Sequence, residues 1–192
     1  VRCHQRTDAR AGGVGLGDRI DALHRAEREY GVPAQYIVAI IGVETYYGKN
    51  MGRWRVIDAL STLAFDYPAR APFFRGELEQ YLLLAREEGL DVFTLRGSFA
   101  GAIGIPQFMP GSLRRYGVDF DKDGAVDLRR SPTDAIGSVA NFLKRHGWRT
   151  GEPVIFRAKV KGEEGSKYID GSVTPKVPLK ELLSAGVELH PK

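Results

Sequence analysis

The chain has 192 residues, of which 43% are apolar and 27% charged, and 28 basic against 24 acidic side chains give a net charge of +4. This usage is typical of a globular protein with a real core, and the single cysteine, Cys3, excludes an intrachain disulfide and a multi-cysteine metal site. No basic run resembles a nucleic-acid-binding arm, so we expect no nucleic-acid partner, and no apolar stretch is long enough for a membrane span.

The first part of the chain predicts two helices after a flexible, glycine-rich lead-in over residues 1–17. Asp18 is placed to cap a helix that ends near Tyr30. Pro33 then opens a second helix, which runs to about Tyr46. Because this second helix is apolar on nearly every side, we expect it to be buried.

Three further helices are predicted, over residues 71–88, over 111–116 and from the capping sequence at 131–134 to about Arg145. The last of them has a serine cap, a proline in the first turn and an early acidic residue, which are strong start signals. Residues 97–110 are rich in glycine and proline but also apolar, which indicates an ordered loop.

Residues 151–192 have a different texture. Apolar and polar residues alternate over 154–160, which predicts a strand, and a short strand near Tyr168 and a short helix over 179–184 are also expected. The expected fold class is α+β and mainly α: a helical body over 18–150 is followed by a small β-leaning tail.

Glu44 is the sharpest anomaly, because it ends the most apolar helix of the chain. Burial would disfavour its charged form and raise its pKa, and the partial negative charge at a helix C-terminus would act in the same direction. A glutamic acid that stays protonated near neutral pH can donate a proton to a leaving group. The alternative is a surface carboxylate paired with Lys49, Arg53 or Arg55.

Many aromatic residues surround Glu44 in the sequence, and such rings stack on sugars as well as filling cores. They are Tyr46, Tyr47, Trp54, Phe65, Tyr67, Phe73, Phe74, Phe99 and Phe108. Glycosidases usually need two carboxylates. The candidates for a second one, Asp58 and Asp66, look like a helix cap or a turn residue, which makes a single-acid mechanism worth considering.

Four ordered blocks resemble the B-type lytic murein transglycosylases, glycoside hydrolase family 103. The blocks are Gly-Val-Glu-Thr-Tyr-Tyr-Gly (42–48), Asp-Ala-Leu-Ser-Thr-Leu-Ala-Phe-Asp-Tyr-Pro (58–68), Gly-Ser-Phe-Ala-Gly-Ala-Ile-Gly-Ile-Pro-Gln-Phe-Met-Pro (97–110) and Asp-Ala-Ile-Gly-Ser-Val-Ala-Asn-Phe (134–142). The resemblance extends over residues 20–155.

This resemblance implies a lysozyme-like, mainly helical fold with a cleft for peptidoglycan glycan strands. Glu44 falls on the single catalytic acid of the family, which would protonate the glycosidic oxygen between MurNAc and GlcNAc. As a carboxylate it would then take the proton of the MurNAc C6 hydroxyl as that oxygen attacks C1. The product is a 1,6-anhydro-MurNAc end, no water is consumed, and the N-acetyl group of the substrate stabilises the charge at C1.

The same resemblance implies several substrate contacts. Ser98 and Gln107 fall on polar contact positions, Phe108 and Tyr47 on aromatic ones, and Arg70 on a basic position near the peptide-bearing sugar. Each also has a structural alternative: a loop hydroxyl, a loop brace, a core ring or a solvated charge.

Residues 119–134 predict an EF-hand-like calcium loop, because hard oxygen ligands at alternate positions suit Ca²⁺. Positions 1, 3, 5, 6, 7 and 9 are Asp119, Asp121, Asp123, Gly124, Ala125 (through its carbonyl) and Asp127. Position 12 is Arg130 instead of Glu, and the resemblance implies that Asp134 supplies the missing carboxylate. We expect a structural ion that pins the loop to the next helix; the alternative is a bare acidic turn.

The chain also departs from the family, whose members continue with a Tyr/Asn-bearing segment that returns to the cleft. No such segment precedes Lys192, so we expect a catalytic-core fragment or a shortened member with a more open cleft. The resemblance implies a monomer in the periplasm or cell envelope, with peripheral or lipid-mediated membrane association left open. Two other readings also stay open: a water-using muramidase on the same fold, with Asp58 or Asp66 placing the water, and a non-catalytic, calcium-stabilised peptidoglycan-binding module.

Overall fold

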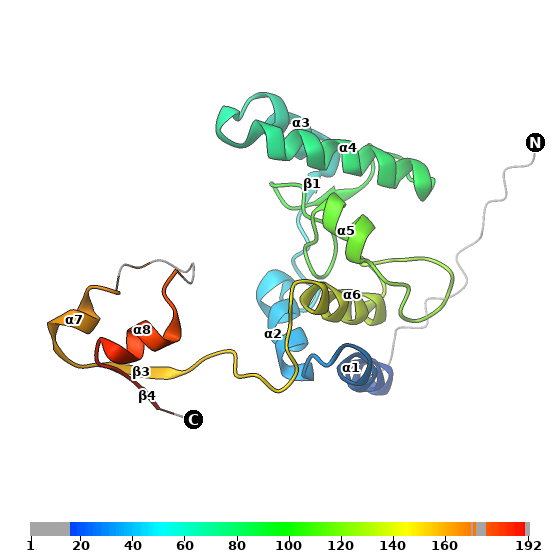
Figure 1. Ribbon diagram of the computed structural model, residues 1–192. Helices are drawn as coiled ribbons and strands as arrows, with labels where there is room; N and C mark the ends of the chain where they lie inside the picture. Colours follow the sequence, from blue (N-terminus) through cyan, green and yellow to red (C-terminus); the bar gives the residue numbers. More distant parts are fainter. Residues whose placement is uncertain (1–15, 170, 172–175, 191–192) are drawn as a thin grey trace, which may run out of the picture. The chain divides into compact units, whose positions relative to one another are not determined.

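Prolines and glycines set most helix limits in the computed structural model, which describes residues 16–169, 171 and 176–190. The chain divides after residue 150 into two units. The larger unit contains α1 (Leu16–Tyr30), α2 (Ala34–Thr45), β1 (Trp54–Arg55), α3 (Val56–Phe65), η1 (Pro68–Arg70), α4 (Ala71–Glu87), β2 (Arg96–Gly97), α5 (Pro110–Tyr116) and α6 (Pro132–Arg145) (Figure 1). The lead-in predicted at 1–17 and Cys3 lie outside the described residues, except that Leu16 and Gly17 already belong to α1.

The predicted helix signals act as expected at several ends. Gly31 and Gly89 follow α1 and α4 with φ of 71° and 64°, which is the left-handed conformation that glycine adopts at low cost. At the start of α6, the Ser131 hydroxyl accepts a hydrogen bond from the Asp134 amide at 3.1 Å. Among the described helices, none is both long and apolar enough to cross a lipid bilayer.

The helix α3 was not among the predicted elements. Its buried residues are Val56, Leu60 and Ala64, which recur every four positions and therefore form one stripe. This stripe packs against α4 in a cluster that also contains Phe74 and Tyr81. Asp58, expected as a cap or turn residue, lies in the first turn of α3.

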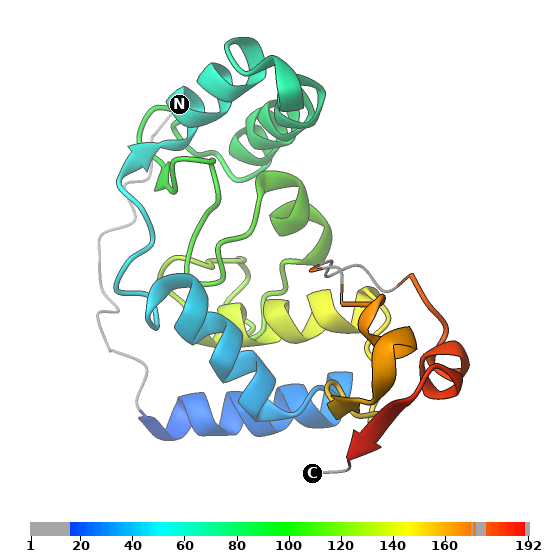
Figure 2. The same ribbon diagram turned by 90° about the vertical axis from the view of Figure 1, so that its left-hand side faces the viewer.

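Two apolar clusters hold the larger unit together. One joins α1, α2 and α6 with the loop around Ile105, and the other joins α3 and α4. Leu113 of α5 packs against both clusters. Accordingly, α5 lies between the α3–α4 pair and the group of α1, α2 and α6 in both ribbon views (Figures 1 and 2).

A two-residue antiparallel ladder connects the segment after α2 to the loop before α5. It pairs Trp54 with Gly97 and Arg55 with Arg96. A side chain at Gly97 would lie 2.2 Å from the Ala102 carbonyl oxygen, so this crossing requires glycine. The ladder fixes where the loop over residues 97–110 begins.

The smaller unit is built on the antiparallel pair β3 (Arg157–Val160) and β4 (Val187–His190), with Arg157 opposite His190. It also contains α7 (Gly162–Ser166) and α8 (Leu179–Ser184). The helix at 179–184 is confirmed, and the strand predicted over 154–160 is confirmed for residues 157–160. The strand expected near Tyr168 is wrong, because α7 and the turn that follows it occupy this part of the chain.

Candidate active site

Glu44 lies in the last turn of α2, and its side chain is exposed. The buried residues of α2 are Ile37, Ile41 and Thr45, whereas Val43 is 86% exposed. The prediction that Glu44 is buried is therefore wrong: the helix is apolar on several sides, but the packing of the unit covers only one of them. In this position the carboxylate is accessible to a large substrate.

The alternative of a surface ion pair is not found either. Arg55 pairs with Asp58 at 2.5 Å, and Lys49 and Arg53 lie over neighbouring aromatic rings. Within the described part of the chain, the Glu44 carboxylate has no hydrogen bond or ion pair. Its position is therefore set by the backbone that carries it.

That backbone turns sharply directly after Glu44. Tyr46 and Tyr47 have φ of 51° and 60°, and Gly48 continues with 83°, so three successive residues are left-handed. For residues with a Cβ this conformation costs about 1 kcal/mol or more each. The Thr45 hydroxyl, which is buried, closes the turn by accepting a hydrogen bond from the Gly48 amide at 2.9 Å.

Gln107 lies on a tight loop beside this turn. An isolated bridge joins Ile103 to Phe108, and Gln107 between them has a left-handed φ of 51°. Its side-chain amide nitrogen donates to the carbonyl oxygens of Gly104 at 2.8 Å and Met51 at 3.2 Å. Gln107 therefore braces the loop against the segment that follows Glu44, as the structural alternative for this residue proposed.

Ser98 is half-buried directly after β2. Its hydroxyl oxygen accepts hydrogen bonds from the amides of Ala100 at 3.3 Å and Ala102 at 3.0 Å. The hydroxyl proton remains able to bond to another acceptor. Ser98 thus both shapes the start of the loop and presents a donor near the surface.

The three other predicted contact residues differ in exposure. Tyr47 is 58% exposed and lines a cavity of about 150 Å³ together with Ile41 and Ile105. Arg70 is exposed at the end of η1, with its guanidinium 4.6 Å from the centre of the Phe73 ring. Phe108 is only 7% exposed and packs in the core, so it offers no free face to a sugar.

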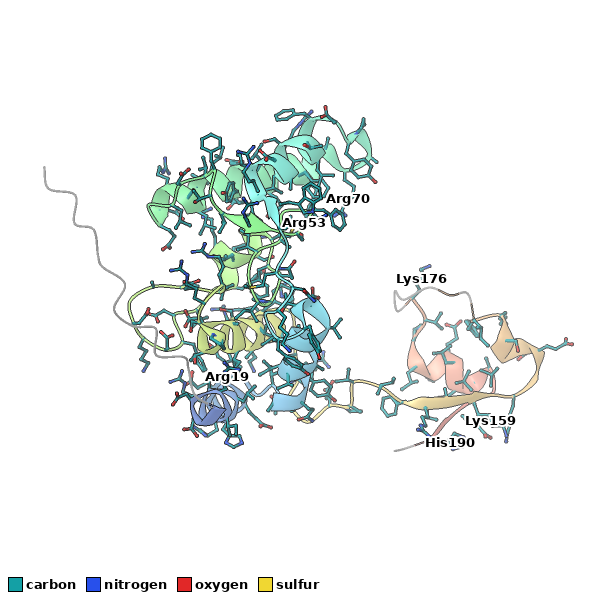
Figure 3. All side chains as sticks on the ribbon, turned by 180° about the vertical axis from the view of Figure 1, so that it is seen from behind. Arg19, Arg53, Arg70, Lys159, Lys176 and His190 are labelled. Atoms are coloured by element: carbon teal, nitrogen blue, oxygen red, sulfur yellow. The ribbon has the colours of Figure 1, made fainter. Side chains whose placement is uncertain are left out.

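The structure also shows which of the aromatic residues around Glu44 are exposed, a distinction that spacing could not provide. The exposed rings are Tyr46, Tyr47, Trp54, Phe65, Tyr67, Phe73 and Phe99. Phe74 is buried. Arg53 and Arg70 lie over two of the exposed rings, and Figure 3 labels both on the part of the unit near β1. Rings with adjacent cations suit a substrate that carries both sugar faces and carboxylates.

The acidic loop brings together three of the predicted metal ligands. Asp119, Asp121 and Asp134 each have a carboxylate oxygen within 4.8 Å of the other two. Asp123 lies outside this group, and its carboxylate accepts a hydrogen bond from the Ala125 amide at 3.0 Å. The three gathered carboxylates are hard oxygen donors and fit a cation such as Ca²⁺.

Asp134 is 1% exposed and organises this loop. It accepts hydrogen bonds from the amides of Phe120 (2.8 Å), Asp121 (3.2 Å) and Asp127 (2.9 Å). Burial raises the pKa of its carboxyl group, although these three amides act in the opposite direction. A bound cation would favour the charged form of the same group.

Comparison with known proteins identifies the family. Residues 2–192 match the transglycosylase SLT domain. The chain belongs to this family. It is 56% identical over 138 residues to the membrane-bound lytic murein transglycosylase B of Escherichia coli K12, an alignment that covers 72% of this chain and 38% of that protein.

Solved structures agree with this assignment. The soluble lytic transglycosylase SltB1 of Pseudomonas aeruginosa superposes with a TM-score of 0.85 at 54% identity, over 90% of this chain and 58% of that one. The E. coli lytic transglycosylase Slt35 in complex with calcium gives 0.82 at 46% identity, over 92% and 55%. The resemblance and the fold class, mainly helical and lysozyme-like with small two-stranded sheets, are thereby confirmed. The chain spans between 38% and 58% of the length of these relatives.

Thr45 is the residue at this site that the sequence did not single out. It has one of the most buried side chains of the unit, although it directly follows the exposed Glu44. The sequence does contain a signal for this role. A small hydroxyl residue stands at the end of an apolar helix, directly before two tyrosines and a glycine, where its side chain can hydrogen-bond to the backbone of the turn.

Proposed function

We propose that this chain is a lytic transglycosylase that cleaves the β-1,4 bond between MurNAc and GlcNAc in peptidoglycan, with Glu44 as its one catalytic acid. The observation that carries this proposal is the exposed Glu44 carboxylate at the end of α2, directly before a turn of left-handed residues, in a chain that is 56% identical to a lytic murein transglycosylase. A glycan strand bound over Glu44 would supply the desolvation that the free site lacks, because it would exclude water from the carboxyl group.

The reaction needs one group that first gives and then takes a proton. Protonated Glu44 would transfer its proton to the glycosidic oxygen as the bond from that oxygen to MurNAc C1 breaks, which releases the GlcNAc hydroxyl. The Glu44 carboxylate would then accept the proton of the MurNAc C6 hydroxyl while the C6 oxygen bonds to C1. Glu44 ends protonated, as it began, and the product carries a 1,6-anhydro ring without any water consumed.

The pairing of Asp58 supports this single-acid mechanism. Asp58 is held by Arg55 on the surface of α3, whereas a water-activating base would have to be free and close to the reacting carbon. Asp66, exposed at the end of the same helix, is the other carboxylate on which a water-using mechanism would depend. The N-acetyl group of the substrate would instead stabilise the positive charge at C1.

Around Glu44 we assign substrate contacts to Ser98, Gln107, Tyr47 and Arg70. The Ser98 hydroxyl proton and the Gln107 amide oxygen are groups that suit the polar atoms of a sugar. The exposed Tyr47 ring suits a sugar face, and the Arg70 guanidinium suits a carboxylate of the peptide stem. Phe108 is left out of this set because it is buried.

We also propose that the acidic loop holds a structural Ca²⁺ ion. Asp119, Asp121 and Asp134 would hold it, with Asp123 and the Ala125 carbonyl completing the shell after a small movement. The ion would neutralise the gathered carboxylates and fix the loop to the start of α6. Support comes from the donor set and from the calcium complex of the relative Slt35.

The remaining assignments follow from the substrate. The partner is the glycan strand of peptidoglycan, and the place of action is the periplasm or cell envelope. One relative is named membrane-bound and another soluble. A monomer suffices for the mechanism, because all assigned groups lie in one unit.

Product analysis tests the proposed function. Purified sacculi are incubated with the chain, and the soluble products are examined by mass spectrometry. We expect 1,6-anhydro ends, which are lighter than reducing ends by one water, and no release by Glu44→Gln at unchanged thermal stability. Reducing ends would identify a muramidase, glycan binding without new ends would identify a binding module, and a Glu44→Gln variant that still releases products would exclude Glu44 as the acid.

A further inference from the structure

Thr45 has contacts on both sides of the turn that follows Glu44. Its side chain is 1% exposed. The hydroxyl oxygen accepts from the Gly48 amide at 2.9 Å, and the hydroxyl donates to the Ile105 carbonyl oxygen at 2.7 Å. One buried group thus joins the end of α2 to the loop that carries Gln107.

The turn needs such a clamp because its backbone is strained. Tyr46 and Tyr47 are both left-handed residues with a Cβ, a conformation that persists only where the surroundings enforce it. Backbone bonds hold the two ends of the turn: the Tyr46 amide donates to the Gly42 carbonyl at 3.0 Å and the Asn50 amide to the Thr45 carbonyl at 2.9 Å, whereas the bonds of the Tyr47 and Lys49 amides inside it are longer, at 3.3 and 3.4 Å. The short bonds of the Thr45 hydroxyl add to this frame and link it to the Ile105 loop.

The loop on the other side is itself fixed. The Ile105 amide donates to the Leu128 carbonyl at 2.7 Å, so this loop is hydrogen-bonded to the acidic loop over residues 119–134. A side chain at Gly104 would lie 2.5 Å from the same carbonyl oxygen, which shows how closely the two backbones approach. The hydroxyl of Thr45 thus attaches the turn after Glu44 to a firmly held part of the unit.

We propose that Thr45 is a positioning residue for Glu44: its hydroxyl locks the turn after α2 to the Ile105 loop and so fixes the direction of the neighbouring carboxylate relative to Gln107. This inference rests on the proposed catalytic function of Glu44. The exposed Glu44 side chain has no partner of its own in the described residues, and its backbone ends α2 directly before this turn. A misplacement of about 1 Å is enough to slow a reaction by up to roughly a hundredfold.

The test compares Thr45→Val, which keeps the shape and removes both hydrogen bonds, with Thr45→Ser, which keeps the hydroxyl. Turnover of soluble NAG–NAM glycan strands is measured well below the melting temperature of each variant. We expect kcat of Thr45→Val to fall by about tenfold or more with KM changed by less than about twofold, and Thr45→Ser to recover most of kcat. Equal kcat in Thr45→Val and the unaltered chain would overturn the proposal.

Ser138→Ala is the matched control. Ser138 is fully buried and its hydroxyl accepts from the Val118 amide at 2.9 Å, so the variant also loses a buried hydroxyl contact, but one on α6. We expect its kcat to be unchanged. The same loss of kcat in Ser138→Ala would mean that general destabilisation, and not the position of Glu44, explains the effect of Thr45→Val.

Hydrogen exchange tests the clamp independently of any activity. In Thr45→Val the Gly48 amide should exchange about five to ten times faster than in the unaltered chain, and Thr45→Ser should retain most of the protection. Unchanged exchange at Gly48 would overturn the proposal even if the chain cleaves glycan. A chain that cleaves no glycan but shows the exchange difference would retain Thr45 as the clamp and overturn only the proposed function.

Discussion

Replacement of Asp134 by alanine tests how much of the fold depends on the acidic loop. The carboxylate accepts three backbone hydrogen bonds, from the amides of Phe120, Asp121 and Asp127, at 2.8, 3.2 and 2.9 Å. Alanine removes both acceptor oxygens, and with them all three hydrogen bonds, at a position that is 1% exposed. The three amides then lack a protein acceptor, and water can reach them only in part.

The expected loss follows from these contacts. An unsatisfied buried donor costs about 1–3 kcal/mol, and the lower end applies to amides that water can reach, so three of them give about 3 kcal/mol. Burial of the carboxyl group itself is unfavourable and raises its pKa, so its removal returns part of this cost. We expect a net loss of about 2–3 kcal/mol, which corresponds to a melting temperature lowered by about 5–10 °C for a chain of this size.

Urea unfolding followed by circular dichroism, with a calcium chelator present, measures this loss. Asp123→Ala is the control in the same loop, because Asp123 is exposed and its carboxylate accepts from the amide of Ala125. We expect it to cost less than about 1 kcal/mol. If Asp134→Ala costs no more than Asp123→Ala, the reasoning that the buried carboxylate organises the loop is refuted.

Three further outcomes are expected. Ca²⁺ at about 100 times its Kd should stabilise the chain by about 2.7 kcal/mol, as measured in a thermal scan. Asp119→Asn should lose this stabilisation. Asp127→Asn should keep most of it, because the Asp127 carboxylate accepts from the amides of Arg129 and Arg130. Burial raises the pKa of Tyr81 to about 12, so between pH 10 and 12 the Tyr81 hydroxyl is protonated in the folded chain and loses its proton on unfolding. The free energy of unfolding should therefore fall as pH rises from 10 to 12. In urea titrations over this range, Tyr81→Phe should show a smaller fall. Glu77→Ala should lower the free energy of unfolding by about 2 kcal/mol, because Glu77 is buried and accepts from the Gly111 amide at 2.8 Å, and Glu77→Gln should recover most of it in the same assay.

Sequence reasoning succeeded where local chemistry decides the structure. The cap at Ser131 and Pro132 fixes the start of α6, and the alternating carboxylates place Asp119 and Asp121 on one side of their loop. It could not show that Asp127 is turned away, towards the amides of Arg129 and Arg130, because that choice depends on hydrogen bonds inside the loop. Helix α3 was missed although Val56, Leu60 and Ala64 stand at helical spacing, because its start has no side-chain cap that would mark it in the sequence.

Glu44 shows why an apolar helix does not by itself predict a buried carboxylate. The sequence of α2 shows that most of its residues are apolar. How many of them are buried depends on which sides of the helix other elements cover, and α1 and α6 cover one side of α2. Val43 and Glu44 lie on an uncovered side, whereas Ile41 and Thr45 face the core. A free site of this kind can still hold its acid in place if the buried side of the same helix end is locked, since Glu44 and Thr45 are adjacent in the last turn of α2. Exposure makes the Glu44 carboxylate accessible to a polymer, and the buried neighbour Thr45 then has to hold the backbone of Glu44 in place.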